Sequence, residues 1–199
     1  MVEKRDVRSF FDRLAPGWDA ETVRNEPVIA RILDHAGVRE GCTVLDVACG
    51  TGVLFGDYVR RGAAQVTAID LSPEMAARAA AKTGGSPVTV LCGDVETDVR
   101  VRENALYDVV MVYNALPHFP DPARLVRMLA GLVKAGGHLS IAHGMSRAAL
   151  DAHHSGCARD VSVGLLHEDE LKSLMAAYLD VDTVISDGEM YQVCGKKRA

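Results

Sequence analysis

The chain has 199 residues, with 22 Lys and Arg against 27 Asp and Glu, so its formal net charge is −5 with the histidines neutral. An acidic balance argues against nonspecific nucleic-acid binding, which depends on a basic surface that neutralises phosphates. The composition, with 48% hydrophobic and 25% charged residues, is that of an ordinary globular protein and excludes disordered and collagen-like classes, while the length fits one domain.

The targeting and redox features of the sequence predict a cytoplasmic protein. The charged start is not followed by an apolar stretch that ends in a cleavage site, so no signal peptide is expected. No uncharged run approaches the roughly 18 residues that a membrane helix needs. The five cysteines are scattered without CxxC spacing, and an odd number cannot all pair within one chain. We therefore expect reduced cysteines and no membrane insertion.

The first forty residues are predicted to be helical and to form a cap on the rest of the domain. Apolar residues recur there at helical spacing: Val28, Ile29, Ile32, Leu33 and Ala36. Such a segment either packs on a sheet or covers a site. We leave both alternatives open.

Strands and helices alternate from residue 42 onward. The run Cys42–Ala48 is a short apolar strand, followed by the glycine-rich letters CGTG and a helical stretch. A second strand, Gln65–Asp70, leads to Ser72-Pro73-Glu74, where Ser is a good N-cap and Pro suits the first helical position. This alternation predicts parallel strand pairing.

The alternation continues through strands at Val88–Leu91, Tyr107–Tyr113 and His138–His143. A helix over 121–134 is well marked, because Asp-Pro opens it and Gly136-Gly137 follow its expected end. After His143 we expect a short helix near Ser146.

The C-terminal part is predicted to end in an antiparallel hairpin. A helix over 168–179 precedes two β-rich segments, Val181–Ser186 and Met190–Gly195, which are joined through Asp187-Gly188, a strong hairpin signal. We therefore predict one α/β domain with a doubly wound, mostly parallel seven-stranded sheet, an antiparallel last strand and helices on both faces. Its parts are a helical cap (1–40), a core (41–145) and an insert with the hairpin (146–199).

The turn after the first strand carries the clearest chemical signal. Two glycines, Gly50 and Gly52, stand where a helix opens, so bare backbone N–H groups can face an anionic group. Asp70 ends the second strand and is placed to accept hydrogen bonds from ribose hydroxyls. Together these features indicate a nucleoside-bearing cofactor.

The spacing within this turn separates two cofactor classes. The dinucleotide fingerprint GxGxxG is not met, because the matching frame reads Ala48, Gly50 and Val53. The form acidic-x-small-x-Gly-x-Gly is met from Asp46 to Gly52, and it resembles the first motif of the class I S-adenosylmethionine-dependent methyltransferases. The resemblance implies that the turn backs the methionine carboxylate and that Asp46 lies toward the ammonium. Ala48 stands where that family usually has glycine.

Later turns extend the resemblance in the expected order. Cys92-Gly93-Asp94-Val95 is similar to the family's adenine-binding turn, which implies Asp94 near the exocyclic amine and Val95 on the ring, with Leu71 and Met75 on the other side. The segment 112–118 is similar to the stretch beside the transferable methyl. Residues 135–139 and the closing hairpin also match the family.

The front segment 10–19 resembles the opening of the ubiquinone/menaquinone-biosynthesis C-methyltransferase branch, where it folds over the cofactor. After about Ser146 that likeness ends, so the substrate of those enzymes is not carried over. The predicted cofactor contacts are Trp18, Asp46, Ala48, Cys49, Gly50, Gly52, Asp70, Leu71, Met75, Gly93, Asp94, Val95, Tyr113 and Asn114. Trp18 and Tyr113 are expected to act as aromatic shields of the sulfonium or the adenine, with core packing as the alternative for Tyr113. For Cys49 we expect a structural role within the turn.

The resemblance implies in-line methyl transfer from S-adenosyl-L-methionine to a small-molecule acceptor, which leaves S-adenosyl-L-homocysteine. Where the acceptor must lose a proton, His118 and His143 are the candidate bases, since each follows the carboxyl end of a strand. The alternatives are a loop histidine that packs on the pocket wall and a strand-end histidine bonded to backbone. Phe11 is a candidate substrate contact or lid residue.

A histidine and cysteine cluster supplies the rival interpretations. His153 and Cys157 have the i, i+4 spacing of two metal ligands on one helix face, although such clusters are more often polar exposed faces. His153 or His154 could instead hydrogen-bond the substrate, and we predict no resident metal.

The rival functions are a nicotinamide-dependent reductase, which Val53 and the hairpin count against, and a catalytically inactive binding protein or metal or haem sensor that uses this cluster with His143. The acceptor, the methylated atom and the oligomeric state stay open, with a homodimer among the alternatives.

Overall fold

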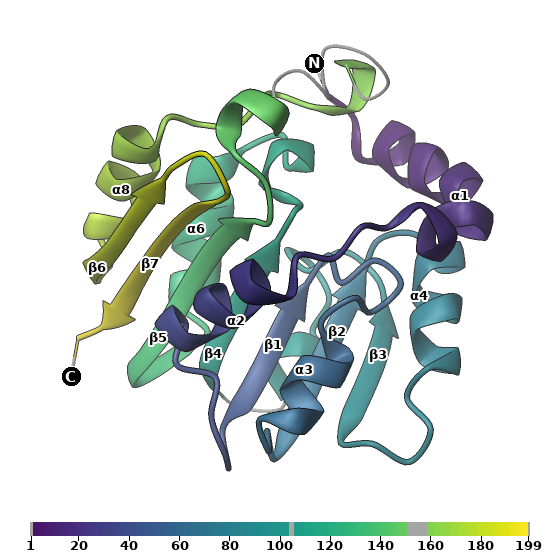
Figure 1. Cartoon of the computed structure of the whole chain (residues 1–199), viewed down its shortest axis with the longest axis horizontal. Helices are drawn as coiled ribbons and strands as arrows, with labels where there is room; N and C mark the ends of the chain where they lie inside the picture. The colour runs from purple at the N-terminus through teal and green to yellow at the C-terminus, as the bar shows by residue number, and fades with distance from the viewer. Residues whose placement is uncertain (1, 104–105, 151–158, 199) are drawn as a thin grey trace.

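The computed structural model describes residues 2–103, 106–150 and 159–198. Seven strands form one sheet in the order β3-β2-β1-β4-β5-β7-β6 (Figure 1). Their bounds are β1 Thr43–Val47, β2 Gln65–Asp70, β3 Val88–Cys92, β4 Tyr107–Tyr113, β5 Val133–His143, β6 Leu179–Ser186 and β7 Tyr191–Lys197. The first five strands pair in parallel, and β7 runs antiparallel to β5 and β6. The predicted fold is confirmed.

Helices cover both faces of the sheet. The longer ones are α1 Lys4–Glu21, α2 Glu26–His35, α3 Phe55–Arg60, α4 Pro73–Ala81, α6 Pro122–Ala130 and α8 Glu168–Ala176. Shorter turns are α5 Arg100–Glu103, η1 Leu116–His118 and η2 Arg159–Val161. In the described residues no helix is both long and apolar enough to cross a bilayer.

Alternate side chains of β4 enter two separate cores. Val110 and Val112 pack in the cluster that includes α6 and α8 residues, whereas Val109 and Met111 pack in the cluster that includes α2 and α3 residues. This division follows from the two-residue repeat of a strand. A sheet buried on both faces leaves its carboxyl-end rim as the place where ligands bind.

Helix starts follow the predicted capping chemistry. The Ser72 hydroxyl accepts a hydrogen bond from the Met75 amide at 3.1 Å, and Pro73 occupies the first turn of α4. Asp121 caps α6 in the same way, accepting from the Arg124 amide at 2.9 Å. These caps place the N-termini of both helices directly after strand-end loops.

The predicted helix over 121–134 was too long at its end. Helix α6 ends at Ala130, and β5 already begins at Val133, which pairs with Tyr107 before the register shifts at Asp108. Gly137 accounts for this bulge, because a Cβ there would lie 2.6 Å from the Asp108 carbonyl oxygen. The two glycines therefore sit inside an irregular strand instead of ending a helix.

The two helices of the N-terminal segment have different surroundings. Helix α2 buries Val28, Ile29, Ile32 and Leu33 against the sheet, whereas α1 buries only Val7 and Ala15. Figure 1 shows α1, in purple, beyond the carboxyl ends of the strands. Both alternatives left open for this segment occur, one in each helix.

Candidate active site

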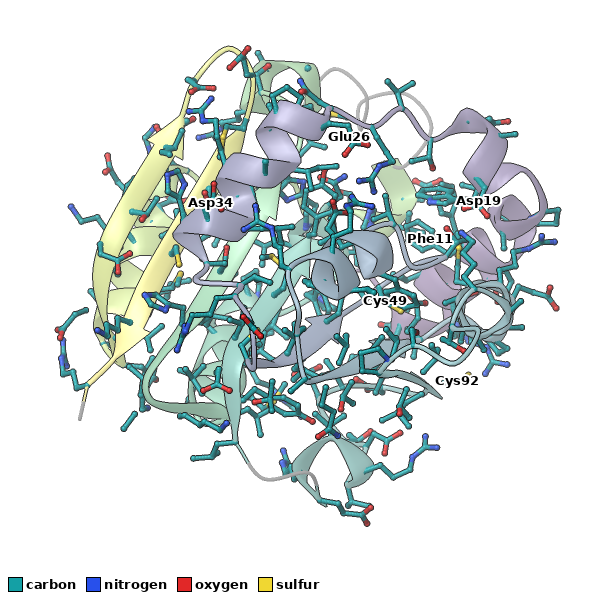
Figure 2. All side chains as sticks on the ribbon, turned by 60° about the horizontal axis from the view of Figure 1, so that its bottom comes forward. Phe11, Asp19, Glu26, Asp34, Cys49 and Cys92 are labelled. Carbon is teal, nitrogen blue, oxygen red and sulfur yellow. The ribbon has the colours of Figure 1, made fainter. Side chains whose placement is uncertain are left out.

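A cavity of about 450 Å³ lies between α1 and the loops that follow the central strands. Most of the predicted site residues line it: Phe11, Trp18, Ala48, Cys49, Gly50, Asp70, Leu71, Met75, Gly93, Asp94, Val95, Tyr113, Asn114 and His118. Asp46, Gly52 and His143 are absent from the lining. Figure 2 shows Phe11 on α1 and Cys49 on the same side of the molecule.

The glycine turn forms the floor of this cavity. Ala48, Gly50 and Gly52 all have positive φ angles, of 54°, 57° and 84°. A Cβ on Gly50 would come no nearer than 4.0 Å to the closest side-chain atom, Trp18 Nε1, so the turn leaves open space above it. At Gly52 a Cβ would lie 2.5 Å from the Phe55 ring, so that glycine is required by packing.

Asp70 ties the glycine turn to the end of β2. Its carboxylate accepts hydrogen bonds from the backbone amides of Gly50, at 2.7 Å, and Ser72, at 2.9 Å. Burial raises the pKa of this carboxyl, and the two hydrogen bonds oppose that rise. Because each carboxylate oxygen has two lone pairs, Asp70 can still accept from a ligand's hydroxyls.

Asp46 lies behind the turn. Burial, with a smaller contribution from the charge of Asp70, raises the pKa of Asp46 to about 8. A cation near the turn would favour the charged form of this carboxyl. Asp46 is buried and does not line the cavity, so its predicted contact with the cofactor stays a prediction.

The turn after β3 also lines the cavity, and there α1 makes a contact that the sequence did not predict. The Lys4 ammonium on α1 donates to Asp94 at 2.6 Å and also pairs with Glu96. Glu96 further pairs with Arg124 of α6 at 2.9 Å. Sequence analysis missed Lys4, because a lysine near the start of a polar helix carries no local signal and its partners lie 90 or more residues away.

Three more polar contacts hold α1 over the cavity. Asp19 accepts hydrogen bonds from the Thr51 hydroxyl and, at 2.7 Å, from the Lys82 ammonium. Asp12 accepts from the Ser72 hydroxyl at the start of α4. Side-chain contacts thus attach α1 to the turns after β1, β2 and β3.

His118 lies at the other end of the cavity, in η1. Its Nδ1 is 2.8 Å from the Val161 carbonyl oxygen. The Phe11 ring meets the imidazole edge to face, with centroids 4.9 Å apart, and meets Trp18 at 5.7 Å. Aromatic side chains of α1 and an imidazole therefore share one wall.

The other predicted acceptor-side residues are not brought to this wall by the described structure. His143 ends β5 as expected, but it is 1% exposed and its ring lies 6.0 Å from that of Tyr191. His153, His154 and Cys157 lie outside the described residues. Within the described ranges no group of three or more His, Cys, Asp or Glu side chains is arranged to hold a metal ion.

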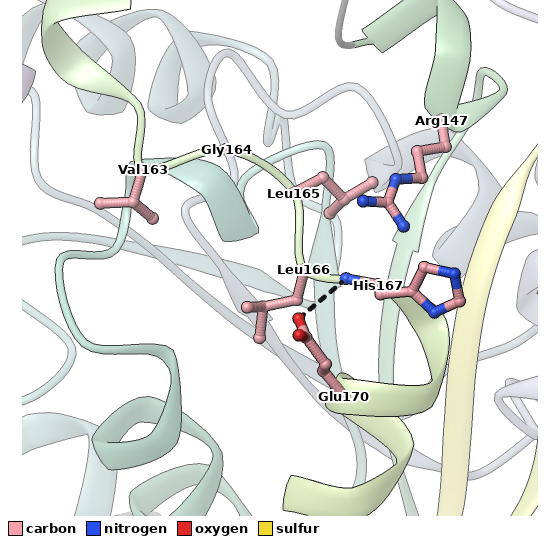
Figure 3. A pocket seen from close by; sticks show the side chains of 7 residues that line it. All are labelled: Arg147, Val163, Gly164, Leu165, Leu166, His167 and Glu170. Atoms are coloured by element: carbon pink, nitrogen blue, oxygen red, sulfur yellow. Dashed lines mark hydrogen bonds between the residues drawn. The ribbon is translucent and has the colours of Figure 1, made fainter.

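A second cavity, of about 580 Å³, lies between Arg147 and the loop before α8 (Figure 3). Its polar side chains make contacts at the N-terminal end of α8. The Glu170 carboxylate accepts a hydrogen bond from the His167 amide at 3.3 Å, and Arg147 pairs with Glu168 at 3.6 Å. None of the predicted motif residues lines it. The first cavity is therefore the candidate active site.

The chain is similar to known methyltransferases. A family model described as a methyltransferase domain matches residues 45–141, which run from β1 into β5. The chain is similar to the ubiquinone biosynthesis O-methyltransferases of Serratia proteamaculans, at 43% identity, and Vibrio cholerae, at 34%, with 69% of this chain matched in each case. It spans 60% and 59% of the length of those relatives.

Solved structures share the fold at lower identity. The putative methyltransferase complexed with the Haloferax volcanii Trm112 activator has a TM-score of 0.78 at 21% identity, covering 95% of this chain and 98% of that one. The magnesium protoporphyrin IX methyltransferase of Synechocystis PCC 6803, with bound S-adenosylhomocysteine, has a TM-score of 0.73 at 16% identity, covering 99% and 100%.

Proposed function

We propose that this chain, which matches a methyltransferase-domain model over residues 45–141, is a class I S-adenosylmethionine-dependent methyltransferase that binds S-adenosylmethionine under α1 and methylates a small molecule there. One observation carries the proposal: the turns after β1, β2 and β3, each with its family motif, line a single cavity of about 450 Å³. A volume of that order is in the usual range for small-ligand sites.

The residues present fit the cofactor. Gly50 leaves room at the floor of the turn, and Asp70 has the lone pairs that ribose hydroxyls require. Asp94 and Val95, opposite Leu71 and Met75, would hold the adenine. When bound, the cofactor supplies an electrophilic methyl on a positively charged sulfur.

On the acceptor side we propose Phe11 as a wall and His118 as the base for an acceptor that must lose a proton. His143 stays a predicted base, and its burial away from the cavity lining does not favour that role. His153 and His154 stay predicted substrate contacts. A cytoplasmic location and a homodimer also stay predictions.

The inactive binding protein is the second candidate function. It would keep the cofactor cavity and make His118 expendable, so alanine at His118 separates the two. The reductase is disfavoured by the family match over 45–141 and by the antiparallel β7.

Calorimetric titration tests the cofactor directly. We expect micromolar binding of S-adenosylmethionine and S-adenosylhomocysteine and none of NADH. Asp70→Ala removes a charged hydrogen-bond acceptor worth about 1.5–3 kcal/mol, so its affinity should fall roughly 10- to 150-fold.

Asp180→Ala is the matched control, since Asp180 lies on β6, at the far edge of the sheet, where it pairs with Arg198. It should bind like the wild type. Absence of binding by the wild-type protein would refute the methyltransferase function.

A further inference from the structure

The hydrogen bond between His118 and Val161 determines which ring nitrogen carries the proton. A backbone carbonyl oxygen can only accept, so Nδ1, 2.8 Å away, must be the donor. In the neutral imidazole the lone pair is then on Nε2. The structure thus specifies one tautomer of the side chain that sits on the acceptor side.

The segment 161–163 is held from two directions. Two residues further on, the Val163 amide donates to the Pro117 carbonyl oxygen at 2.8 Å, which straps residues 161–163 across the η1 loop. The Val161 side chain is 5% exposed and packs in a small cluster with Val7 of α1, against which Phe10 and Phe11 also pack. The strap, residues 161–163, therefore touches both His118 and the covering helix.

We propose that this strap is a positioning device: the Val161 carbonyl keeps His118 as the Nδ1–H tautomer, so that Nε2 takes a proton from a hydroxyl acceptor during methyl transfer. The proposal rests on the proposed function. In the step, the acceptor oxygen uses an electron pair to form the bond to the methyl carbon, the bond from sulfur to that carbon breaks, and its pair stays on sulfur. The hydroxyl proton moves to His118 Nε2, so one positive charge passes from the sulfonium to the imidazolium.

The surroundings of His118 favour a ring-bearing acceptor. The Phe11 ring lies edge to face on the imidazole, at 84° between planes. Apolar side chains continue the lining on this side: Phe119, Pro120, Met145 and Leu150. Phenol and 4-nitrophenol are therefore suitable probes, because a flat ring can pack against such walls.

Nuclear magnetic resonance can identify the tautomer of His118 without an activity assay. Two-bond ¹H–¹⁵N spectra at pH 8, without ligands, should show a protonated Nδ1 and an unprotonated Nε2 for the signal that His118→Asn removes. A protonated Nε2 with an unprotonated Nδ1 would overturn the proposal. Val163→Pro deletes the amide that straps the loop and should mix the two tautomers, whereas Val163→Ala keeps that amide and should not.

Methyl transfer to the two probes tests the chemical role. With phenol, His118→Asn should lose about 10²- to 10⁴-fold in kcat, the usual contribution of a general base. With 4-nitrophenol, whose hydroxyl is already ionised at pH 8, the loss should be less than about tenfold. Equal losses in kcat with the two probes would refute the role of His118 as the base. His167→Asn, at an exposed helix cap where Asn also serves, is the control and should match the wild type.

The strap is tested by the matched pair at Val163, whose side chain does not line the active-site cavity. Val163→Pro should lower kcat about 10- to 100-fold with phenol, because small misplacements of a reacting group have effects of this size. Equal rates for Val163→Pro and Val163→Ala would overturn the positioning role. Should Val163→Pro fail to fold, the wild-type tautomer and the two probes still decide.

Failure of the inference and failure of the proposed function give different results. If S-adenosylmethionine does not bind in the calorimeter, the proposed function is wrong. If it binds and the methyl is transferred to aniline or thiophenol but not to phenol or 4-nitrophenol, the inference of a hydroxyl acceptor is wrong while the proposed function stands. If it binds and none of these probes is methylated, the inferred acceptor class is likewise overturned.

Discussion

At the scale of single residues, Ala48 adopts a backbone conformation that alanine disfavours. Its φ of 54° is in the left-handed region, where an L side chain costs roughly 1–2 kcal/mol. The sequence motif showed Ala48 at a position where glycine is usual, and the structure supplies the physical reason for that usage. The turn keeps its shape because Gly50 and Gly52 share the same region and Asp70 holds the Gly50 amide.

Ala48→Gly should therefore stabilise the protein. Relief of the left-handed strain exceeds the added entropy of the unfolded chain, about 0.4–1 kcal/mol, so the net gain should be about 0.5–1 kcal/mol in urea denaturation. Ala77→Gly, on the exposed side of α4, should instead destabilise by about 1 kcal/mol. A loss of stability in Ala48→Gly would contradict the strain.

At the scale of elements, α1 is attached to the cavity by charge and hydroxyl contacts more than by apolar packing. Lys4, Asp12 and Asp19 each bind a different turn, while only Val7 and Ala15 of α1 are buried. Exposed ion pairs are worth little individually and are screened by salt. Opening of α1 should accordingly respond to ionic strength.

Lys4→Met, which keeps the aliphatic stem without the charge, should speed the release of S-adenosylhomocysteine. With about 0.2–1 kcal/mol for a partly exposed pair, stopped-flow release should be roughly 1.4- to 5-fold faster than in the wild type. Added salt should accelerate the wild type more than the variant. Lys172→Met, on the exposed face of α8, should release the ligand at the wild-type rate.

Elements that depend on neighbouring residues could be predicted from the sequence, whereas contacts between distant segments could not. Alternating strands and helices, the Ser72 and Asp121 caps and the glycine turn were predictable, because each depends on a few neighbouring residues. The pairing of Lys4 with Asp94 and the strap at Val161 were not, because they join distant segments. The Gly137 bulge was misread as a helix end, since its cause is the approach of Asp108 from another strand.

At the scale of the whole molecule, ligand binding and folding are linked, since the cavity exists only when α1 and three strand ends are assembled. S-adenosylhomocysteine at 100 times its dissociation constant should add about 2.7 kcal/mol to the free energy of unfolding. For a chain of this size the calorimetric Tm should rise by roughly 5–10 °C. NADH at the same concentration should leave Tm unchanged, and an equal rise with NADH would contradict a site specific for the methionine derivatives.

Helix α1 forms a wall at both ends of the cavity, through Lys4 beside Asp94 and through Phe11 beside His118. On the proposed function, an outward movement of α1 would open the cofactor end and the acceptor end of the cavity together. Such a movement would be needed in each catalytic cycle, and its rate would then limit turnover. The proposed function therefore predicts inhibition by S-adenosylhomocysteine that is held in the cavity by α1.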